Sequence, residues 1–300
     1  MQIRSFVSLP ANFRSVDVLS FFSRDVLGTS ERVLGQTIQK AFMYEGSAAY
    51  IEIKLTKKRA TYLMELQKVS KNKNALTSLA KKIVTHILGL GQPVEDMEKK
   101  FGRHSAMARL LKANSGLRVP QSVTVWEALV SAVIGQQVSV SAATSMRVKF
   151  INGLGLRHAS GLVCFPGPRE VTRSNIAQLA TYGLSRQKAQ TITDLANQVV
   201  DGVLLLDYWR EHFDYDEVTD ALISIKGIGW WTVNYALLRG YSYLNGSLHG
   251  DAAVRRNLQR LLNLEESPSA LETEKFLSQF EPYRALIAAH LWALKRLDGY

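Results

Sequence analysis

The sequence has very little cysteine, and this scarcity excludes several kinds of site. Cys164 is the single cysteine among the 300 residues, so the chain cannot form an internal disulfide bond, a zinc centre built on cysteines or an iron–sulfur cluster. The six histidines do not occur at the spacing of metal ligands either. We therefore expect no cofactor and no metal site made of side chains.

The sequence also lacks long apolar runs. No segment approaches the roughly 18 apolar residues that cross a membrane, and the first residues, MQIRSFVSLPANFR, have no apolar core of the kind found in signal peptides. A hydrophobic content of 46% with 21% charged residues is typical of a globular protein with a packed core. We expect a soluble, intracellular monomer without a membrane partner, cytoplasmic in a bacterium and nuclear in a eukaryote.

What the sequence does have is an excess of basic residues. The net charge of +11 favours a polyanionic partner. The excess is uneven, because residues 1–115 contain 19 Lys and Arg against 9 Asp and Glu, whereas residues 116–300 contain 18 against 17. Bulk charge therefore points to the first third, and a nucleic-acid interface elsewhere has to come from local geometry.

The first 115 residues have the pattern of a small α+β domain. Two β-rich runs, 36–44 and 48–56, flank Glu45-Gly46-Ser47, which predicts a hairpin, and 59–69 is a candidate third strand. The segment 74–90 then repeats apolar residues at helical spacing. We expect the domain to end near residue 115, where the apolar content falls.

Residues 116–300 have the pattern of a helical domain. Thr124 and Glu127 have the spacing of a capping box, Gly135-Gln136-Gln137 interrupts the helix that follows, and Ser185 can cap another. The segment 201–220 carries seven acidic residues and one arginine. We expect that segment on a solvated face, directed away from any nucleic acid.

Residues 224–241, SIKGIGWWTVNYALLRGY, combine a short glycine turn with an aromatic helix. Gly227 and Gly229 permit unusual backbone angles and close approach, and Ile228 between them would enter the core. The next helix would present unpaired N–H groups and its positive dipole end to a phosphate. Lys226 adds a cation nearby. A helix–turn–helix in which the glycines serve only tight packing is the alternative.

The helix after the turn carries an aromatic stripe. Trp231 and Tyr235 lie four residues apart, so they share one face, and Gly240 is expected to end the helix. Core burial would also explain such a stripe. Further on, Asp251 opens HGDAAVRRNL, where it is either an ordinary N-cap or a functional carboxylate.

These segments together resemble the helix-hairpin-helix DNA glycosylases, and most closely the DNA-3-methyladenine glycosylase II branch. The resemblance rests on LISIKGIGWWTVNYALLRGY and GDAAVRRNL, supported by WEALVSAVIGQQVS, GLSRQKAQTITDLA and RALIAAHLWAL. It implies a mainly α fold, with an N-terminal α+β domain over 1–115 and a two-lobed helical glycosylase core over 116–300. The helix-hairpin-helix motif would lie at about 219–239.

The resemblance implies an enzyme of base excision repair whose partner is double-stranded DNA containing alkylated bases. It would flip out purines of the 3-methyladenine or 7-methylguanine type and hydrolyse the N-glycosidic bond. Asp251 stands at the place of the family's catalytic aspartate. Trp231 stands where lyase relatives carry a nucleophilic lysine, and an indole cannot form a Schiff base, so no lyase activity is expected. Since alkylation makes the base a cationic leaving group, one carboxylate that stabilises the oxocarbenium-like sugar and orients water is enough.

The resemblance also assigns the rest of the site. The expected base pocket consists of Trp231, Tyr235 and Trp292, with Phe21 or Phe22 from the N-terminal domain. Gln137 is the candidate side chain that fills the space left by the flipped nucleotide. The expected DNA contacts are Gln137, Lys226, Gly227, Ile228, Gly229 and Thr232. A monovalent cation is a further candidate ligand, held by the backbone of Ile223, Ile225 and Ile228.

Two other functions are compatible with the sequence. A DNA-binding protein without catalysis could keep the hairpin as a phosphate clamp, although a clamp needs neither Asp251 nor the aromatic set. A glycosylase for another lesion, such as a deaminated or mismatched base, would use the same fold.

Overall fold

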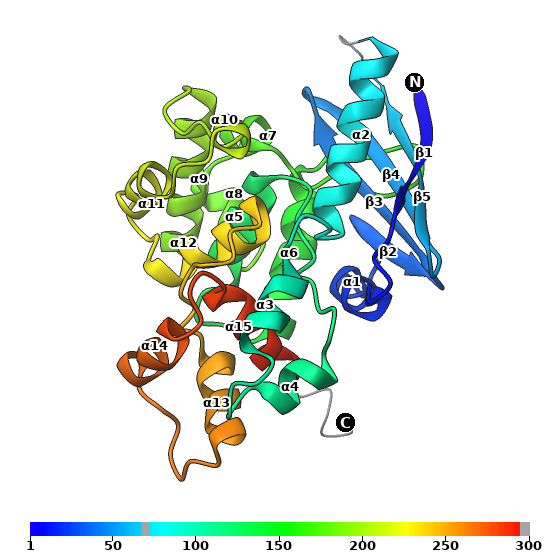
Figure 1. The fold of residues 1–300 in the computed structure, drawn as a ribbon. Helices are drawn as coiled ribbons and strands as arrows, with labels where there is room; N and C mark the ends of the chain where they lie inside the picture. The colour runs from blue at the N-terminus through cyan, green and yellow to red at the C-terminus, as the bar shows by residue number, and fades with distance from the viewer. Residues whose placement is uncertain (68–71, 295–300) are drawn as a thin grey trace.

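The computed structural model describes residues 1–67 and 72–294, in which a sheet at the N-terminus is followed by helices (Figure 1). Residues 68–69 of the predicted third strand and 295–300 of the predicted helical domain lie outside the described residues. The strands are β1 (Gln2–Ser8), β2 (Glu31–Leu34), β3 (Thr37–Tyr44), β4 (Ser47–Leu55) and β5 (Arg59–Leu66). The helices are α1 (Ser15–Phe22), α2 (Lys73–Ile87), α3 (Val94–Phe101), α4 (Ala108–Ala113), α5 (Val125–Gly135), α6 (Val140–Leu154), α7 (Pro168–Thr172), α8 (Ile176–Thr181), α9 (Arg186–Val200), α10 (Tyr208–Glu211), α11 (Tyr215–Ile223), α12 (Trp230–Ala236), the π-helix η1 (Leu237–Tyr241), α13 (Ala252–Leu262), α14 (Ala270–Ser278) and α15 (Arg284–Ala293).

The five strands form one antiparallel sheet in the order β1-β5-β4-β3-β2. The predicted hairpin is confirmed between β3 and β4, where Tyr44 pairs with Ser47. Its two-residue loop, Glu45 and Gly46, has positive φ angles of 45° and 70°, as tight hairpin turns require. The predicted helix corresponds to α2, which lies across the sheet and shares its hydrophobic core (Figure 1).

The helices form two further cores, so the helical part has two lobes. One core joins α5, α6, α9, α11 and α12. The other joins α13, α14 and α15 with α3 and α4, and Figure 1 shows these helices gathered together below the sheet. Because α3 and α4 share a core with helices beyond residue 115, the division at 115 stays a proposal. Within the described residues, no helix combines the length and the apolar character that a membrane crossing needs.

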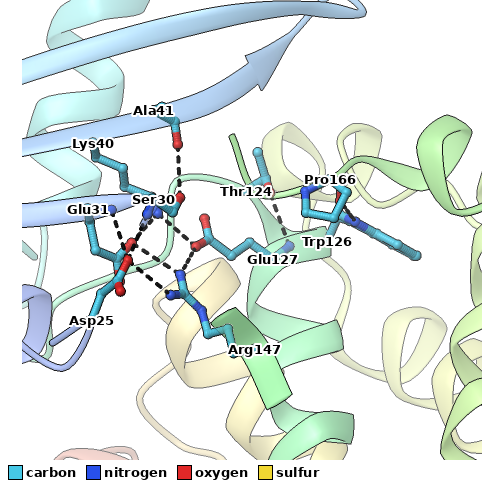
Figure 2. A network of polar contacts seen from close by, with 10 residues as sticks. All are labelled: Asp25, Ser30, Glu31, Lys40, Ala41, Thr124, Trp126, Glu127, Arg147 and Pro166. Carbon is cyan, nitrogen blue, oxygen red and sulfur yellow. Dashed lines mark hydrogen bonds and ion pairs between the residues drawn. The ribbon is translucent and has the colours of Figure 1, made fainter. Parts of the chain in front are cut away.

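A buried group of ion pairs joins the sheet to the helices (Figure 2). The ammonium of Lys40 on β3 is 1% exposed and contacts Glu31 on β2 and, at 2.8 Å, Glu127 on α5. Arg147 on α6 contacts the same two carboxylates, at 3.1 Å and 2.8 Å. A fifth member, Asp25, lies 4.0 Å from Arg147. Since the partners come from both parts of the chain, this ionic cluster fixes the sheet against α5 and α6.

The ionic cluster corrects one detail of the predicted capping box. Thr124 does cap α5, because its hydroxyl oxygen accepts the N–H of Glu127 at 3.1 Å. The carboxylate of Glu127 does not accept the backbone N–H of Thr124, as a capping box requires, and instead contacts Lys40 and Arg147. Two buried cations stabilise that carboxylate more than a single neutral N–H donor would.

Candidate active site

A cavity of about 1270 Å³ is lined by residues of the sheet domain and of both helical lobes. It brings together most of the residues singled out in the sequence. Those in its lining are Phe21, Phe22, Gln137, Gly227, Gly229, Trp231, Thr232, Tyr235, Asp251 and Trp292. The others, Ile223, Ile225, Lys226 and Ile228, are not in the lining.

Asp251 is both the N-cap of α13 and one of the residues that line this cavity. Its Oδ1 accepts the backbone N–H groups of Ala253 and Val254, both at 2.9 Å, and so caps α13. The same oxygen accepts the indole N–H of Trp292 at 3.1 Å, and Oδ2 accepts that of Trp231 at 2.9 Å. A carboxylate oxygen has two lone-pair directions, so Oδ1 is fully used while Oδ2 keeps acceptor capacity. The interpretation as an N-cap and the interpretation as a functional carboxylate are therefore compatible, because the cap uses Oδ1 and leaves acceptor capacity on Oδ2.

The aromatic residues form one wall beside this carboxylate. The rings of Trp231 and Tyr235, one helical turn apart on α12, stack with centroids 5.3 Å apart. Trp292 from α15 follows at 6.4 Å from Tyr235. Phe21 is half-buried on the cavity, whereas Phe22 is buried in the core of the sheet domain. The rings of Trp231 and Trp292, with that of Tyr235 between them, thus offer flat, apolar surface beside the carboxylate of Asp251.

Only one of the two glycines in the turn has the unusual backbone angle that the sequence predicts. Gly227 has φ of +94°, and a Cβ there would lie 2.2 Å from the hydroxyl oxygen of Thr191, so only glycine fits. Gly229 has an ordinary φ of −111°. Ile228 is buried in the helical core as predicted, and Lys226 is exposed.

Thr232 does not present its side chain to solvent. It is 2% exposed, and its hydroxyl oxygen accepts a bond from Gln136 at 2.8 Å. A phosphate contact by this residue would therefore have to use its backbone N–H. In the turn itself, the carbonyl of Ile225 accepts the N–H of Ile228 at 3.0 Å, and the monovalent cation site at Ile223, Ile225 and Ile228 stays a prediction.

The loop between α5 and α6 is fastened to the glycine turn by a residue that the sequence analysis missed. The side-chain amide of Gln136 donates to the carbonyl of Gly227 at 2.9 Å, besides its bond to Thr232. Lys188 donates to the carbonyls of Ile134 and Gln136, at 2.9 Å and 2.7 Å. Gln137, the next residue, is exposed at the tip with φ of +52°. The predicted interruption of the helix at Gly135-Gln136-Gln137 is confirmed, because α5 ends at Gly135 and α6 begins at Val140, but the sequence does not show which glutamine faces inward.

The end of the aromatic helix differs from the prediction. Gly240 does not end it, because α12 widens into the π-helix η1, and the left-handed residue that follows is Ser242, with φ of 60°. Gly240 instead permits close packing on α5, where a Cβ would lie 3.1 Å from the Cα of Val125. The widened turn carries Arg239, a buried residue in the cavity lining that sequence analysis also missed. The pattern of apolar residues gives no sign of a π-helix.

Comparison with known proteins gives two family matches. Residues 130–282 match the HhH-GPD superfamily of base excision DNA repair proteins, and residues 9–124 match the AlkA N-terminal domain. Among curated proteins, the chain is similar to DNA-3-methyladenine glycosylase 2 of Escherichia coli, 27% identical over 191 residues that cover 63% of this chain and 64% of that protein. It therefore spans less than two thirds of the length of that relative. DNA-3-methyladenine glycosylase 1 of Schizosaccharomyces pombe is 24% identical over 234 residues, 77% of this chain and 94% of that protein.

A solved structure has the same fold over nearly the whole chain. The 3-methyladenine DNA glycosylase from Archaeoglobus fulgidus superposes with a TM-score of 0.85 at 22% sequence identity, covering 98% of this chain and 99% of that one. At this identity the likeness concerns the fold.

Proposed function

Because the chain belongs to the HhH-GPD superfamily of base excision DNA repair proteins, we propose that it is a monofunctional DNA glycosylase that removes alkylated purines from duplex DNA. The observation that carries this proposal is the position of Asp251. Its carboxylate is held by the indole N–H groups of Trp231 and Trp292 on the wall of a cavity large enough for a nucleotide. A phosphate clamp without catalysis would need neither the carboxylate nor the rings.

The chemistry assigned to Asp251 follows from its two oxygens. Three N–H donors fix Oδ1, while Oδ2 has a single donor, and Asp251 lines the same cavity as the rings. As the N-glycosidic bond breaks, positive charge develops on the sugar, and the adjacent carboxylate stabilises it. Oδ2 also accepts a proton or hydrogen bond from the attacking water. The departing base stacks on the rings of Trp231, Tyr235 and Trp292.

We propose that the enzyme has no lyase step, since its cavity offers no free amine for a Schiff base. Within the described residues, two lysines line the cavity, Lys40 and Lys188. The ammonium of Lys40 is held by two buried carboxylates. The ammonium of Lys188 is held by the backbone carbonyls of Ile134 and Gln136, to which it donates. The position of the nucleophilic lysine in lyase relatives is filled by Trp231.

Binding of DNA is assigned to the two turns beside the cavity. The turn at Gly227 and Gly229, with Lys226, would hold a backbone phosphate, and the exposed Gln137 would enter the duplex where the nucleotide has left. Gln136 ties these two turns together, so that both would meet the duplex in a fixed relation. Affinity for undamaged duplex is then expected to fall steeply with added salt.

The test is release of bases from alkylated duplex DNA by three forms of the full chain. The wild type is expected to release 3-methyladenine and 7-methylguanine without cutting the strand. Asp251→Asn keeps an oxygen for the cap and for Trp292 but puts an amide donor at Oδ2, so we expect release to fall at least a hundredfold. Asp214→Asn is the matched control, because Asp214 caps α11 by accepting the N–H of Glu217 at 2.9 Å, outside the cavity.

The outcomes separate the parts of the proposal. Release by Asp251→Asn at the wild-type rate would reduce Asp251 to a helix cap. Strand cleavage at the vacated site by the wild type would disprove the monofunctional assignment and leave base removal intact.

A further inference from the structure

A second pocket, of about 280 Å³, lies where β3, the start of α5 and the segment between α9 and α10 meet. Leu205 and Tyr208, which are 43% and 53% exposed, belong to its lining, so the pocket is open to solvent. The buried side chains of the lining are mostly apolar and include Phe42, Trp126, Phe165, Leu204 and Leu206. The volume is close to the lower end of the range for small-molecule sites.

Glu127 supplies a carboxylate oxygen to this second pocket. Of the described residues, Glu127 alone lines both the second pocket and the cavity at Asp251. Its Oε1 accepts from Lys40 and from Arg147, both at 2.8 Å. Its Oε2 is buried and has no hydrogen-bond partner among the described residues, and Figure 2 shows this oxygen turned away from Arg147. Because a buried polar atom without a partner is costly, Oε2 is an acceptor for a donor that enters the second pocket.

The ionic cluster around Glu127 has an excess of negative charge. Its members are the carboxylates of Asp25, Glu31 and Glu127 and the cations Lys40 and Arg147, so that three negative charges face two positive ones. Within the described residues, no lysine, arginine or histidine lines the second pocket, whereas Asp207 adds an exposed carboxylate to its lining. Since a buried charge is stabilised by an opposite charge beside it, the second pocket favours a cation.

The walls of the second pocket select an organic cation over a metal ion. Calcium and magnesium bind about six or more oxygen ligands, and Glu127 offers a single buried oxygen. Apolar walls instead suit a hydrocarbon chain, and an aromatic face attracts an ammonium group. The ring of Trp126 is held in the wall, because its indole N–H donates to the carbonyl of Pro166 at 2.8 Å (Figure 2).

We propose that the second pocket is a binding site for an aliphatic amine. The ammonium group donates to Oε2 of Glu127, and the hydrocarbon chain lies against Trp126 and Phe165. The inference stands apart from the proposed glycosylase function, because among the described residues none of those assigned to base removal lines this pocket.

The test is isothermal titration calorimetry of the full chain with hexylamine at pH 7, where the amine is charged. Hexanol, which has the same hydrocarbon chain without the charge, is the control ligand. We expect hexylamine to bind with a dissociation constant of about 1 mM or lower. Hexanol should bind about tenfold more weakly, because it cannot form a charge-assisted hydrogen bond to the carboxylate.

Substitutions at two positions of the lining locate the binding. Glu127→Gln keeps the shape of the side chain and an oxygen for Lys40 and Arg147, and it should weaken hexylamine binding about tenfold. Met43→Lys places an ammonium of the chain itself in the lining and should also weaken it about tenfold. Met43→Gln is the matched control for charge at that position. Asp201→Asn is the control for the acidic segment, since Asp201 is exposed and lies outside the pocket lining. Both controls should leave the affinity for hexylamine unchanged.

The source of the amine is distinguished by titrating Nα-acetyl-lysine amide, in which the same ammonium extends from a peptide unit. Tighter binding of this compound than of hexylamine would assign the ammonium to a lysine side chain of a partner. Weaker binding would assign it to a free amine, and both results support the site.

Three results would overturn the inference. The first is the absence of any heat of binding with hexylamine well above the expected dissociation constant, in which case water alone satisfies Oε2. The second is equal affinity for hexylamine and hexanol. The third is an unchanged affinity in Glu127→Gln and Met43→Lys. If Glu127→Gln gives no folded protein, the comparison of Met43→Lys with Met43→Gln decides. None of these results bears on base release, which is measured separately.

Discussion

Replacing Lys40 by methionine tests whether the ionic cluster holds the sheet domain to the helices. The substitution keeps the length and the apolar stem of a side chain that is 1% exposed, but removes the charge between Glu31 and Glu127. Arg147 then faces these two carboxylates alone. Removing one partner of a buried ion pair destabilises a protein by about 3–5 kcal/mol, because the other charge stays buried without compensation. Because Arg147 still compensates part of the charge, we expect a loss of about 3 kcal/mol at pH 8.

The loss should depend on pH in a defined direction. In the wild type, burial raises the pKa of Glu31, but the charges of Arg147 and Lys40 outweigh it and hold that pKa below its ordinary value. The carboxylate thus adds stability above pH 4.5, which is lost as the pH falls through its folded pKa. Without Lys40, burial dominates and the carboxylate pKa rises, so protonation relieves the unpaired charge. The difference between wild type and variant should therefore shrink between pH 8 and pH 5.

The assay is urea unfolding followed by tryptophan fluorescence at both pH values. Lys82→Met is the matched control, because Lys82 on α2 pairs with Glu211 on α10 at 3.1 Å while both side chains are more than 60% exposed. That exposed pair is expected to contribute less than about 1 kcal/mol. The reasoning is refuted if Lys40→Met costs no more than Lys82→Met, or if its effect is the same at pH 5 and pH 8.

Three further predictions concern single side chains. Trp292→Phe keeps a ring but removes one N–H donor to the carboxylate of Asp251, so base release should fall about tenfold while the affinity for undamaged duplex stays the same. A parallel loss of affinity would contradict this prediction. Gln136→Leu should lower the free energy of unfolding by about 1–2 kcal/mol, since two hydrogen bonds to the glycine turn are lost, and an unchanged melting temperature would argue against that tie. Burial lowers the pKa of His290 to about 3, and neither ring nitrogen has a partner among the described residues. Because the unfolded chain binds the proton more readily, the folded state loses stability as the pH falls below about 6.5. In thermal unfolding, His290→Leu should therefore raise the free energy of unfolding by about 1 kcal/mol at pH 7 and by more at pH 5.

The parts of the structure that depend on neighbours in the sequence could be predicted. Thr124, Ser185 and Asp251 each cap the helix that follows them, because a cap needs only a short polar side chain next to an apolar repeat. The β3–β4 hairpin follows from Glu45-Gly46 in the same way. The family resemblance added the grouping of Asp251 with distant Trp292, which no local pattern contains.

The parts that depend on distant partners could not be predicted. Glu127 has the spacing of a capping box, yet its carboxylate is drawn to Lys40, 87 residues away. No pattern in the sequence marks Arg239, which the π-helix η1 places in the cavity lining. Gln136 and Gln137 are the same residue type, yet Gln136 bonds to the glycine turn and Gln137 is exposed, and only the fold decides which one does so. In each case a buried charge or amide found its partner through tertiary packing.

The bonds from Trp231 and Trp292 to Asp251 have a consequence for how such an enzyme can diversify. In the proposed mechanism, each indole is both a surface for the base and a support for the reacting carboxylate, so exchanging either one is expected to alter turnover together with selectivity. Phe21 and Arg239 line the same cavity, whereas the donors to the Asp251 carboxylate among the described residues are Trp231, Trp292, Ala253 and Val254. Related enzymes that acquire a new substrate preference without losing turnover are therefore expected to differ at Phe21 and Arg239 and to keep Trp231 and Trp292.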